Sequence, residues 1–410
     1  MTKKSFHADT KIALAVFVAA LGYFVDAYDI MLFSIIRTKS LLGIGVPSED
    51  VFNLGIELLN WQLVGMLVGG VFWGILGDKR GRLSVLFGSI LLYSFGNIAN
   101  GFVHSVEAFR WMRFITGVGL AGELGAGVTL VSEIMSRTSR GWGTMVIASV
   151  GVMGVVAASL VGQAFTWQTS FFVGGGMGLG LLVLRLGVLE SGMYQALSKK
   201  KIRRGDFLSL FSSWTMARKY FRPIFVALPV WYIVGVLMTF SPEIGKALGL
   251  ATPPEAGQSI FYAYIGLTTG DFISGSLSQL LRNHKKIIAF MLALNCLFIG
   301  VYLLWGGISL PIFYGICVCL GFSAGFWAVL MVSCVEQFGT NLRATVSITA
   351  PNFVRGSAVI LTLVFKKLTP IVGTVPAAAW VGVATMVLAF LALRNLEETY
   401  GKDLDYVEPV

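Results

Sequence analysis

Long apolar segments constrain what this chain can fold into more than any other feature. Twelve runs of about 20 residues are each long enough to cross the hydrocarbon core of a bilayer as a helix. The chain is 56% hydrophobic and 13% charged, which excludes an ordinary soluble domain. We therefore expect an all-α membrane protein with twelve transmembrane helices. The predicted spans are approximately 12–36, 58–77, 83–103, 107–131, 143–165, 169–189, 223–248, 258–281, 286–306, 309–335, 344–364 and 374–393.

The basic residues give the predicted topology. The first span follows Lys3, Lys4 and Lys11, but it is about 25 residues long and lacks an Ala-x-Ala-type end, so we expect a retained helix. The two termini and the 2–3, 4–5, 6–7, 8–9 and 10–11 loops hold about 22 of the 31 Lys and Arg residues. Both termini are therefore predicted to be cytoplasmic, in a multi-pass protein of a bacterial inner (plasma) membrane.

Several classes of function are disfavoured. The formal net charge of +10 would suit nucleic acid, but the bases lie in loops on one side of the membrane, so lipid headgroups are the expected partner. His7, His104 and His284 are far apart, and no phosphate loop or nucleophile motif is present, so we expect no enzyme, metal site or cofactor. Free, packed thiols are expected at Cys296, Cys317, Cys319 and Cys334.

The sequence contains an internal repeat, with similar motifs in its two halves. Glu133 and Arg140, at the end of one apolar run, recur about 200 residues further on as Glu336 and Arg343. The loop "GILGDKRGRLSV" after the second span recurs as "GSLSQLLRNHKK" after the eighth, with Gln279 in the place of the acid. "VLESG" and "LEETYGKDL" close the two halves at nearly the same spacing. Three patterns in the same order indicate a duplication.

The duplication and the longest internal polar stretch predict four regions. An N-terminal six-helix bundle covers 1–189, and a C-terminal six-helix bundle covers 223–393. A basic cytoplasmic linker covers 190–222, and its "FLSLFSSW" segment, Phe207 to Trp214, is predicted to form an amphipathic surface helix. A cytoplasmic tail covers 394–410.

These motifs resemble those of the major facilitator superfamily. The resemblance rests on "GDKRGR", on Arg113 in "RFITGVGLAGELG", on both Glu/Arg pairs, and on "ES" and "ETYGKDL". Within the superfamily it points to the branch of sugar porters and metabolite or aromatic-acid proton symporters. The resemblance implies two six-helix bundles that rock around a central site by alternating access.

The loop after the second span has two interpretations. Asp78 at a helix end can accept backbone donors of the next helix and pair with Arg82 or Arg140. Alternatively, the loop bases only fix the topology. The resemblance implies a conformational latch on the inner face, formed by Gly74, Asp78, Arg82, Glu133, Arg140, Glu336 and Arg343.

Charges inside the hydrocarbon region are the candidate proton-coupling residues, because each costs at least about 2.5 to 3.5 kcal/mol there. Asp29 and Arg113 fall at a similar depth, and we predict that they form an ion pair that a proton switches; a static pair is the alternative. Asp26 lies on nearly the same helix face, and this "D-x-x-D" pattern looks more like the metabolite and aromatic-acid symporters than the sugar porters. Glu123 is either a second proton carrier or a packed acid.

Asp271 and Arg355 fall near mid-depth in the second half. Arg355 lies in "APNFVRGSAV", where Pro351 and Gly356 loosen the helix. An arginine at this depth suggests a substrate carboxylate or phosphate; pairing with Asp271 or another acid is the alternative. Side chains that can line the site, though lipid-facing roles are open for each, are Tyr23, Tyr28, Trp61, Trp231, Tyr232, Tyr262, Tyr264, Trp327 and Asn352, of which Trp231, Tyr232, Trp327 and Asn352 are the predicted substrate contacts.

The predicted function is proton-coupled symport, by a monomer without a cofactor, of a small anionic or zwitterionic metabolite such as a carboxylate or amino acid. A sugar or polyol porter is the alternative if Arg355 pairs internally. A proton-coupled antiporter or exporter and a transport-dead sensor are further alternatives.

Overall fold

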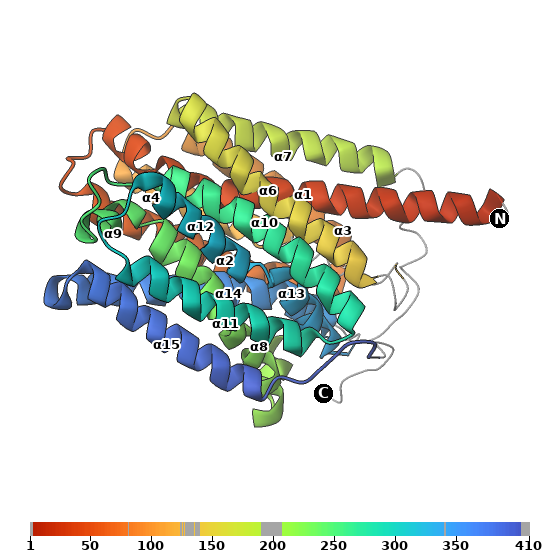
Figure 1. Cartoon of the computed structure of the whole chain (residues 1–410). Coiled ribbons are helices and arrows are strands. Elements are labelled where there is room, and N and C mark those ends of the chain that lie inside the picture. Colours follow the sequence, from red (N-terminus) through yellow and green to blue (C-terminus); the bar gives the residue numbers. More distant parts are fainter. Residues whose placement is uncertain are drawn as a thin grey trace.

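The computed structural model describes residues 3–80, 82–123, 140–189, 207–339 and 342–402, with the isolated positions 125, 127 and 135 (Figure 1). These residues form helices and connecting turns without any strand, which confirms the predicted all-α class. The first half contains α1 (Lys3–Gly43), α2 (Val51–Arg80), α3 (Arg82–Asn100), α4 (Val106–Leu120), α6 (Arg140–Ala164) and α7 (Trp167–Leu189). The second half contains the 3₁₀ helix η2 (Phe207–Phe211), α8 (Trp214–Tyr232), the π-helix η3 (Ile233–Met238), α9 (Ser241–Ala247), α10 (Ala256–Leu281), α11 (His284–Leu304), α12 (Leu310–Ala324), α13 (Trp327–Glu336), α14 (Arg343–Val372) and α15 (Thr374–Arg394).

The helices account for the twelve predicted spans. In the described part of the chain, nine spans are long and apolar enough to cross a membrane, formed by α1, α2, α6, α7, α8 with η3, α11, α12 with α13, α14 and α15. The other predicted spans correspond to α3, α4 and α10, and most of 124–131 in the fourth span lies outside the described residues. The helices form one bundle, and α1 projects beyond it at its N-terminal end (Figure 1).

The start of the second half differs from the prediction. α8 begins at Trp214 rather than at 223, because the Ser213 side chain caps it by accepting a hydrogen bond from the backbone N–H of Met216 at 3.2 Å. Of the predicted amphipathic helix from Phe207 to Trp214, Phe207–Phe211 form the 3₁₀ helix η2 and Trp214 is the first residue of α8. Its place on the cytoplasmic surface stays a prediction. Residues 190–206 of the linker lie outside the described residues, and the division of the chain there stays a prediction.

The two halves meet in a symmetric way. The main contacts between them are α2 against α14 and α6 against α10. Under the predicted duplication α2 corresponds to α10 and α6 to α14, so these two contacts are equivalent. Within the halves, α2 packs on α4 as α10 packs on α12, and α3 packs on α7 as α11 packs on α15. The packing therefore repeats with the sequence.

Glycines allow the closest helix approaches at equivalent places in both halves. Gly65 of α2 lies against the backbone of Phe114 in α4, and Gly266 of α10 lies against the backbone of Val318 in α12. A Cβ atom at either glycine would overlap a carbonyl oxygen of the facing helix. Only glycine fits there without moving a helix, as is common for small residues between membrane helices.

Gly321 in α12 provides a test of this packing. A Cβ atom there would overlap the carbonyl oxygen of Ala263 in α10, whereas Gly315 in the same helix faces open space. We expect Gly321→Ala to lower the melting temperature, because displacing the helix costs about 1–3 kcal/mol. Gly315→Ala should leave it unchanged or raise it, because alanine favours a helix by up to about 1 kcal/mol. Fluorescence-detected melting of the two purified variants compares them, and equal melting temperatures would contradict the packing argument.

Candidate functional site

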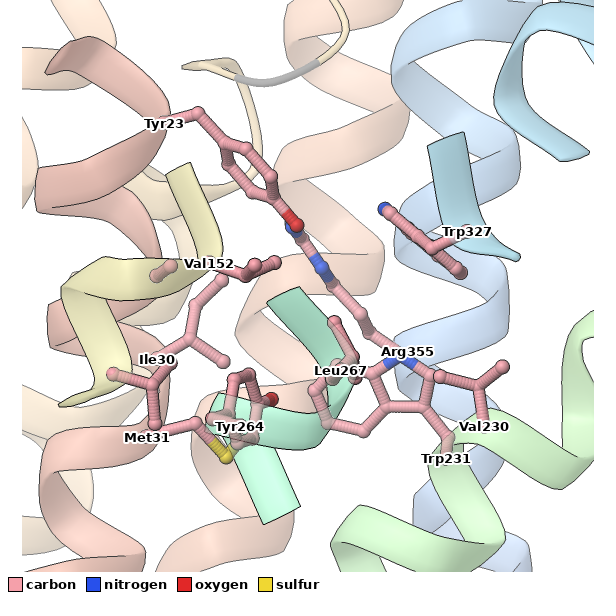
Figure 2. A pocket seen from close by; sticks show the side chains of 12 residues that line it. Tyr23, Ile30, Met31, Val152, Val230, Trp231, Tyr264, Leu267, Trp327 and Arg355 are labelled. Carbon is pink, nitrogen blue, oxygen red and sulfur yellow. The ribbon is translucent and has the colours of Figure 1, made fainter. Parts of the chain in front are cut away.

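A central cavity lies between the two halves. Its empty volume is about 400 Å³, which includes space open to solvent. Side chains from α1 and α6 form one side, and side chains from α8, α10, α13 and α14 form the other (Figure 2). The lining residues are Tyr23, Ala27, Ile30, Met31, Val152, Val155, Val230, Trp231, Tyr264, Leu267, Trp327 and Arg355.

Contacts between the halves lie on both sides of this cavity. On the side where α1 ends, three polar pairs join them, Arg37 to Glu243 at 3.0 Å, Gln258 to Gln163 at 2.8 Å and Thr362 to Asn60 at 3.1 Å. On the side where α14 begins, Asn352 donates to the carbonyl of Ala121 at 2.7 Å and Ser347 donates to that of Gly125 at 3.2 Å. The structure therefore has the cavity between two layers of inter-half contacts.

Arg355 links the halves at the cavity itself. Its Nη2 lies 3.5 Å from Oδ2 of Asp26 on α1, and its Nη1 lies 3.4 Å from Oδ1 of Asn352. The Arg355 side chain is 2% exposed and that of Asp26 is 0% exposed. Of the two predicted alternatives for Arg355, internal pairing is thus present in this conformation. The partner is Asp26 and not Asp271.

Two further donors converge near this guanidinium. Figure 2 shows the Tyr23 hydroxyl beside the Arg355 guanidinium, with the indole of Trp327 facing both. The Nε1 atom of Trp327 is buried and has no hydrogen-bond partner among the described residues. A buried donor without a partner costs about 1–3 kcal/mol. An anionic acceptor in the cavity would satisfy it.

Asp271 has a structural contact instead of an ion pair. Its Oδ1 accepts the backbone N–H of Ala328 at 3.0 Å, in the first turn of α13. The predicted tenth span is broken just before this point, between Ala324 and Trp327. Asp271 therefore caps the second half of a discontinuous helix. The predicted alternative was that Arg355 pairs with Asp271 or another acid, and in this structure the acid is Asp26.

Arg113 does not form the predicted direct ion pair with Asp29. Its guanidinium donates to Oδ1 of Asn100 at 3.1 Å, to Oε1 of Gln62 at 3.2 Å and to Oδ1 of Asn97 at 3.4 Å. These amides from α2 and α3 satisfy the guanidinium, so it needs no carboxylate within bonding distance. Asp29 and Arg113 still interact electrostatically without a direct contact. The two residues share a region, as their depths predict, and their role in proton coupling stays a prediction.

Glu123 is paired by an arginine that the sequence analysis missed. Arg185 of α7 donates to both carboxylate oxygens of Glu123, from Nη1 to Oε2 at 3.1 Å and from Nη2 to Oε1. The two side chains are 6% and 1% exposed. Gly22 of α1 leaves room for the pair, since a Cβ there would overlap it. This arrangement favours the packed acid over the second proton carrier, and the signal was a charge inside the apolar span 169–189.

The predicted substrate contacts divide into two groups. Trp231 and Trp327 line the cavity, as do Tyr23 and Tyr264 from the wider set of aromatic candidates. Tyr232 does not line it, because its hydroxyl donates to the carbonyl of Ala378 in α15 at 2.7 Å. Asn352 contacts the guanidinium of Arg355 rather than the cavity.

Only part of the predicted latch can be described. Gly74 packs against Thr349 of α14, so α2 and α14 approach closely there. Oε2 of Glu336 lies 3.4 Å from Nε2 of His284, and Arg343 donates to the carbonyl of Phe338 at 3.4 Å. Glu133 and the side chains of Asp78, Arg82 and Arg140 lie outside the described residues. The latch stays a prediction.

The tail after α15 folds back onto the start of α11. The Glu398 carboxylate accepts the backbone N–H groups of His284 at 3.1 Å, Lys285 at 2.9 Å and Tyr400 at 2.9 Å. Partial burial raises the pKa of Glu398, but the three backbone donors outweigh it, so the pKa is lowered. A group with a lowered folded pKa stabilises above its unfolded pKa, near about 4.3, and loses this effect as pH falls through the folded pKa.

We therefore expect Glu398→Gln to speed hydrogen exchange at the amides of His284 and Lys285 by about fivefold at pH 7, as for a lost cap of about 1 kcal/mol. The difference should disappear at acidic pH, where the wild-type carboxylate is protonated. Glu397→Gln is the matched control, because Glu397 is exposed and next in sequence. A difference that persists below the folded pKa would contradict the charge argument.

Comparison with known proteins agrees with this architecture. The sequence matches the profile of the Major Facilitator Superfamily over residues 12–363. It is 28% identical over 352 residues to the putative niacin/nicotinamide transporter NiaP of Bacillus subtilis, covering 82% of this chain and 84% of the relative. It is 26% identical to a probable 4-methylmuconolactone transporter of Cupriavidus pinatubonensis, covering 79% of this chain and 76% of the relative.

The fold is also that of a solved transporter. The proton:xylose symporter XylE, bound to 6-bromo-6-deoxy-D-glucose, superposes with a TM-score of 0.71 over 97% of this chain and 98% of XylE. The two sequences are 15% identical, so the likeness extends to the fold alone.

Proposed function

The chain belongs to the major facilitator superfamily, and we propose that it imports a small aromatic monocarboxylate together with a proton. It is a multi-pass integral membrane transporter and not an enzyme. We further propose that it acts as a monomer in a bacterial inner membrane with both termini in the cytoplasm. The basic loops support that orientation.

The observation that carries the substrate class is the arginine in the cavity. The Arg355 guanidinium, the Tyr23 hydroxyl and the Trp327 indole N–H form a group of donors suited to one carboxylate. Trp231 and Tyr264 add flat aromatic surface to the same cavity. Niacin, an aromatic carboxylate that the name of one relative includes, has this combination of groups.

The proton is proposed because two buried carboxylates near the cavity are poorly neutralised by the described residues, since Asp26 has one contact of 3.5 Å with Arg355 and Asp29 has no ion-pair partner. Asp26 and Asp29 are both 0% exposed, and neither oxygen of Asp29 has a hydrogen-bond partner among the described residues. Ionised carboxylates in such a place are costly unless they change protonation or partners during the cycle. A carrier for an anion can use that change to take up a proton.

A ligand panel and a transport assay test the proposal. We expect nicotinate and benzoate to raise the melting temperature of the purified protein, and xylose and inorganic phosphate to leave it unchanged. In proteoliposomes, a pH gradient that is alkaline inside should drive accumulation of nicotinate, and a protonophore should abolish it. Stabilisation by xylose alone would favour the sugar porter. Nicotinate binding without any uptake would indicate a sensor.

A further inference from the structure

The charges around Arg355 suggest how one substrate carboxylate is coupled to one proton. We propose that Asp26 is the proton acceptor, and that a substrate carboxylate bound to the cavity face of Arg355 drives a proton onto Asp26. The inference rests on the proposed function. It assigns the coupling to the pair between Asp26 and Arg355 rather than to Asp29 and Arg113.

The pair between Asp26 and Arg355 is loose. Its single contact of 3.5 Å lies beyond the usual hydrogen-bond distance, and Oδ1 of Asp26 has no partner among the described residues. The pair between Glu123 and Arg185, in contrast, has two hydrogen bonds. A buried carboxylate held by one long contact gives up its charge more readily than one held by two.

Arg355 has two faces, and Asp26 occupies only one of them. Arg355 and Tyr23 line the cavity, while Asp26 does not, so the acid holds the guanidinium from outside the cavity wall. A substrate carboxylate can therefore reach the guanidinium without removing Asp26. It also meets the indole N–H of Trp327, which Asp26 does not use.

One guanidinium cannot neutralise two carboxylates at a buried site with a largely apolar lining. Two anions on the same cation repel each other strongly where water is scarce, and one of them takes a proton. The free site carries one positive and one negative charge. The loaded site carries Arg355, the substrate anion and a neutral Asp26, so its net charge is again zero. The proton comes from solvent and adds to a carboxylate oxygen of Asp26, and no other bond is made or broken.

Of the other acids around Asp26, Glu123 and Asp271 have partners of their own, and Asp29 has no hydrogen-bond partner among the described residues. Glu123 is held by Arg185 of α7, and Oδ1 of Asp271 in α10 accepts the backbone N–H of Ala328 in α13, while its Oδ2 has no partner among the described residues. Asp29, on the same helix as Asp26, lies in the field of Arg113 of α4. In the described part of the chain, the other titratable groups that act on this region are Tyr23 of α1, Tyr93 of α3 and Tyr264 of α10. Asp26 is therefore the acid whose partner the substrate would share.

The pair also joins the two halves, since Asp26 lies on α1 and Arg355 on α14. When the proton neutralises Asp26, Arg355 is held by the substrate instead. The protonation step and the change in the inter-half contact are then the same event, which is the requirement for coupling the proton to the rocking motion.

Proton uptake on binding tests the inference, with nicotinate as the probe and nicotinamide as its neutral counterpart. Calorimetry of the full-length protein in buffers of different ionisation enthalpy counts the protons. We expect about one proton taken up per nicotinate and none per nicotinamide, and a nicotinate Kd that rises about tenfold per pH unit where free Asp26 is ionised. For Asp26→Asn, uptake should vanish and Kd should change less than about twofold between pH 6 and 8.

Asp29→Asn is the rival variant, and it should keep the proton uptake. The inference is overturned if Asp29→Asn abolishes the uptake and Asp26→Asn retains it, or if wild-type protein binds nicotinate without taking up a proton. If Asp26→Asn does not fold, the Asp29→Asn variant still decides, because loss of proton uptake in that variant overturns the inference. Failure of nicotinate to bind at all would instead overturn the proposed function, and this inference with it.

Discussion

Replacing Arg355 by alanine should reduce nicotinate binding by more than about 100-fold. Hydrogen bonds to charged groups contribute about 1.5–3 kcal/mol each, and a carboxylate can form two with a guanidinium. Arg355→Lys keeps the charge but not the planar pair of donors, so we expect an intermediate loss. Calorimetry or a radioligand binding assay measures both. Unchanged binding by Arg355→Ala would contradict the placement of the carboxylate.

A matched double variant separates binding from folding. Arg355→Ala alone removes the cation beside Asp26, which is fully buried, so the melting temperature should fall as well. Arg355→Ala combined with Asp26→Asn removes both charges, and it should regain stability without regaining affinity. If the double variant regained affinity, the loss in the single variant would be a folding effect.

The outcome at Arg355 shows what the sequence can and cannot predict about such a site. Its depth in the membrane follows from counting residues along the helix, and the arginine does line the central cavity. The ion-pair partner of Arg355 cannot be predicted in the same way, because counting residues does not show which helices of the two halves face each other. Asp271 lies at a similar depth but is used as a cap for α13, whereas Asp26 faces Arg355 from the other half.

The first-half charges show the same limit. Asp29 and Arg113 were matched by depth, yet the amides of Gln62, Asn97 and Asn100 take the guanidinium. Neutral polar side chains inside an apolar span are hard to identify as partners from a sequence. In a bilayer, however, they can accept hydrogen bonds from a charged donor in place of a carboxylate. The sequence does not predict which aromatic side chains line the cavity, for a different reason. Tyr232 adjoins Trp231 in sequence, but the two face different neighbours, and only the packing decides which one reaches the cavity.

The duplication, in contrast, could be predicted well. Short motifs at a constant spacing identified two halves, and the structure repeats its packing with the same spacing, down to Gly65 and Gly266 at equivalent helix contacts. Such positions are set by backbone approach, which depends on residue size alone. The buried charged residues differ between the halves, so the repeat could not be used to predict which of them form ion pairs.

The largest loss of stability is expected from breaking the pair between Glu123 and Arg185. Both side chains are buried, and removing one partner of a buried pair costs about 3–5 kcal/mol because the other charge loses its counter-ion. Glu123→Ala and Arg185→Ala should therefore each lower the melting temperature markedly. Glu107→Ala is the control, because the Glu107 side chain is 64% exposed and its contact with Arg110 at the surface contributes at most about 1 kcal/mol.

A double replacement distinguishes a structural pair from a proton carrier. Glu123→Leu with Arg185→Met removes both charges and keeps the volume, so much of the stability lost in the single variants should return, since buried ion pairs are often replaceable in this way. If Glu123 serves only this pair, the double variant should also accumulate nicotinate under a pH gradient. A stable double variant that binds nicotinate but no longer accumulates it would instead identify Glu123 as a residue of the proton path.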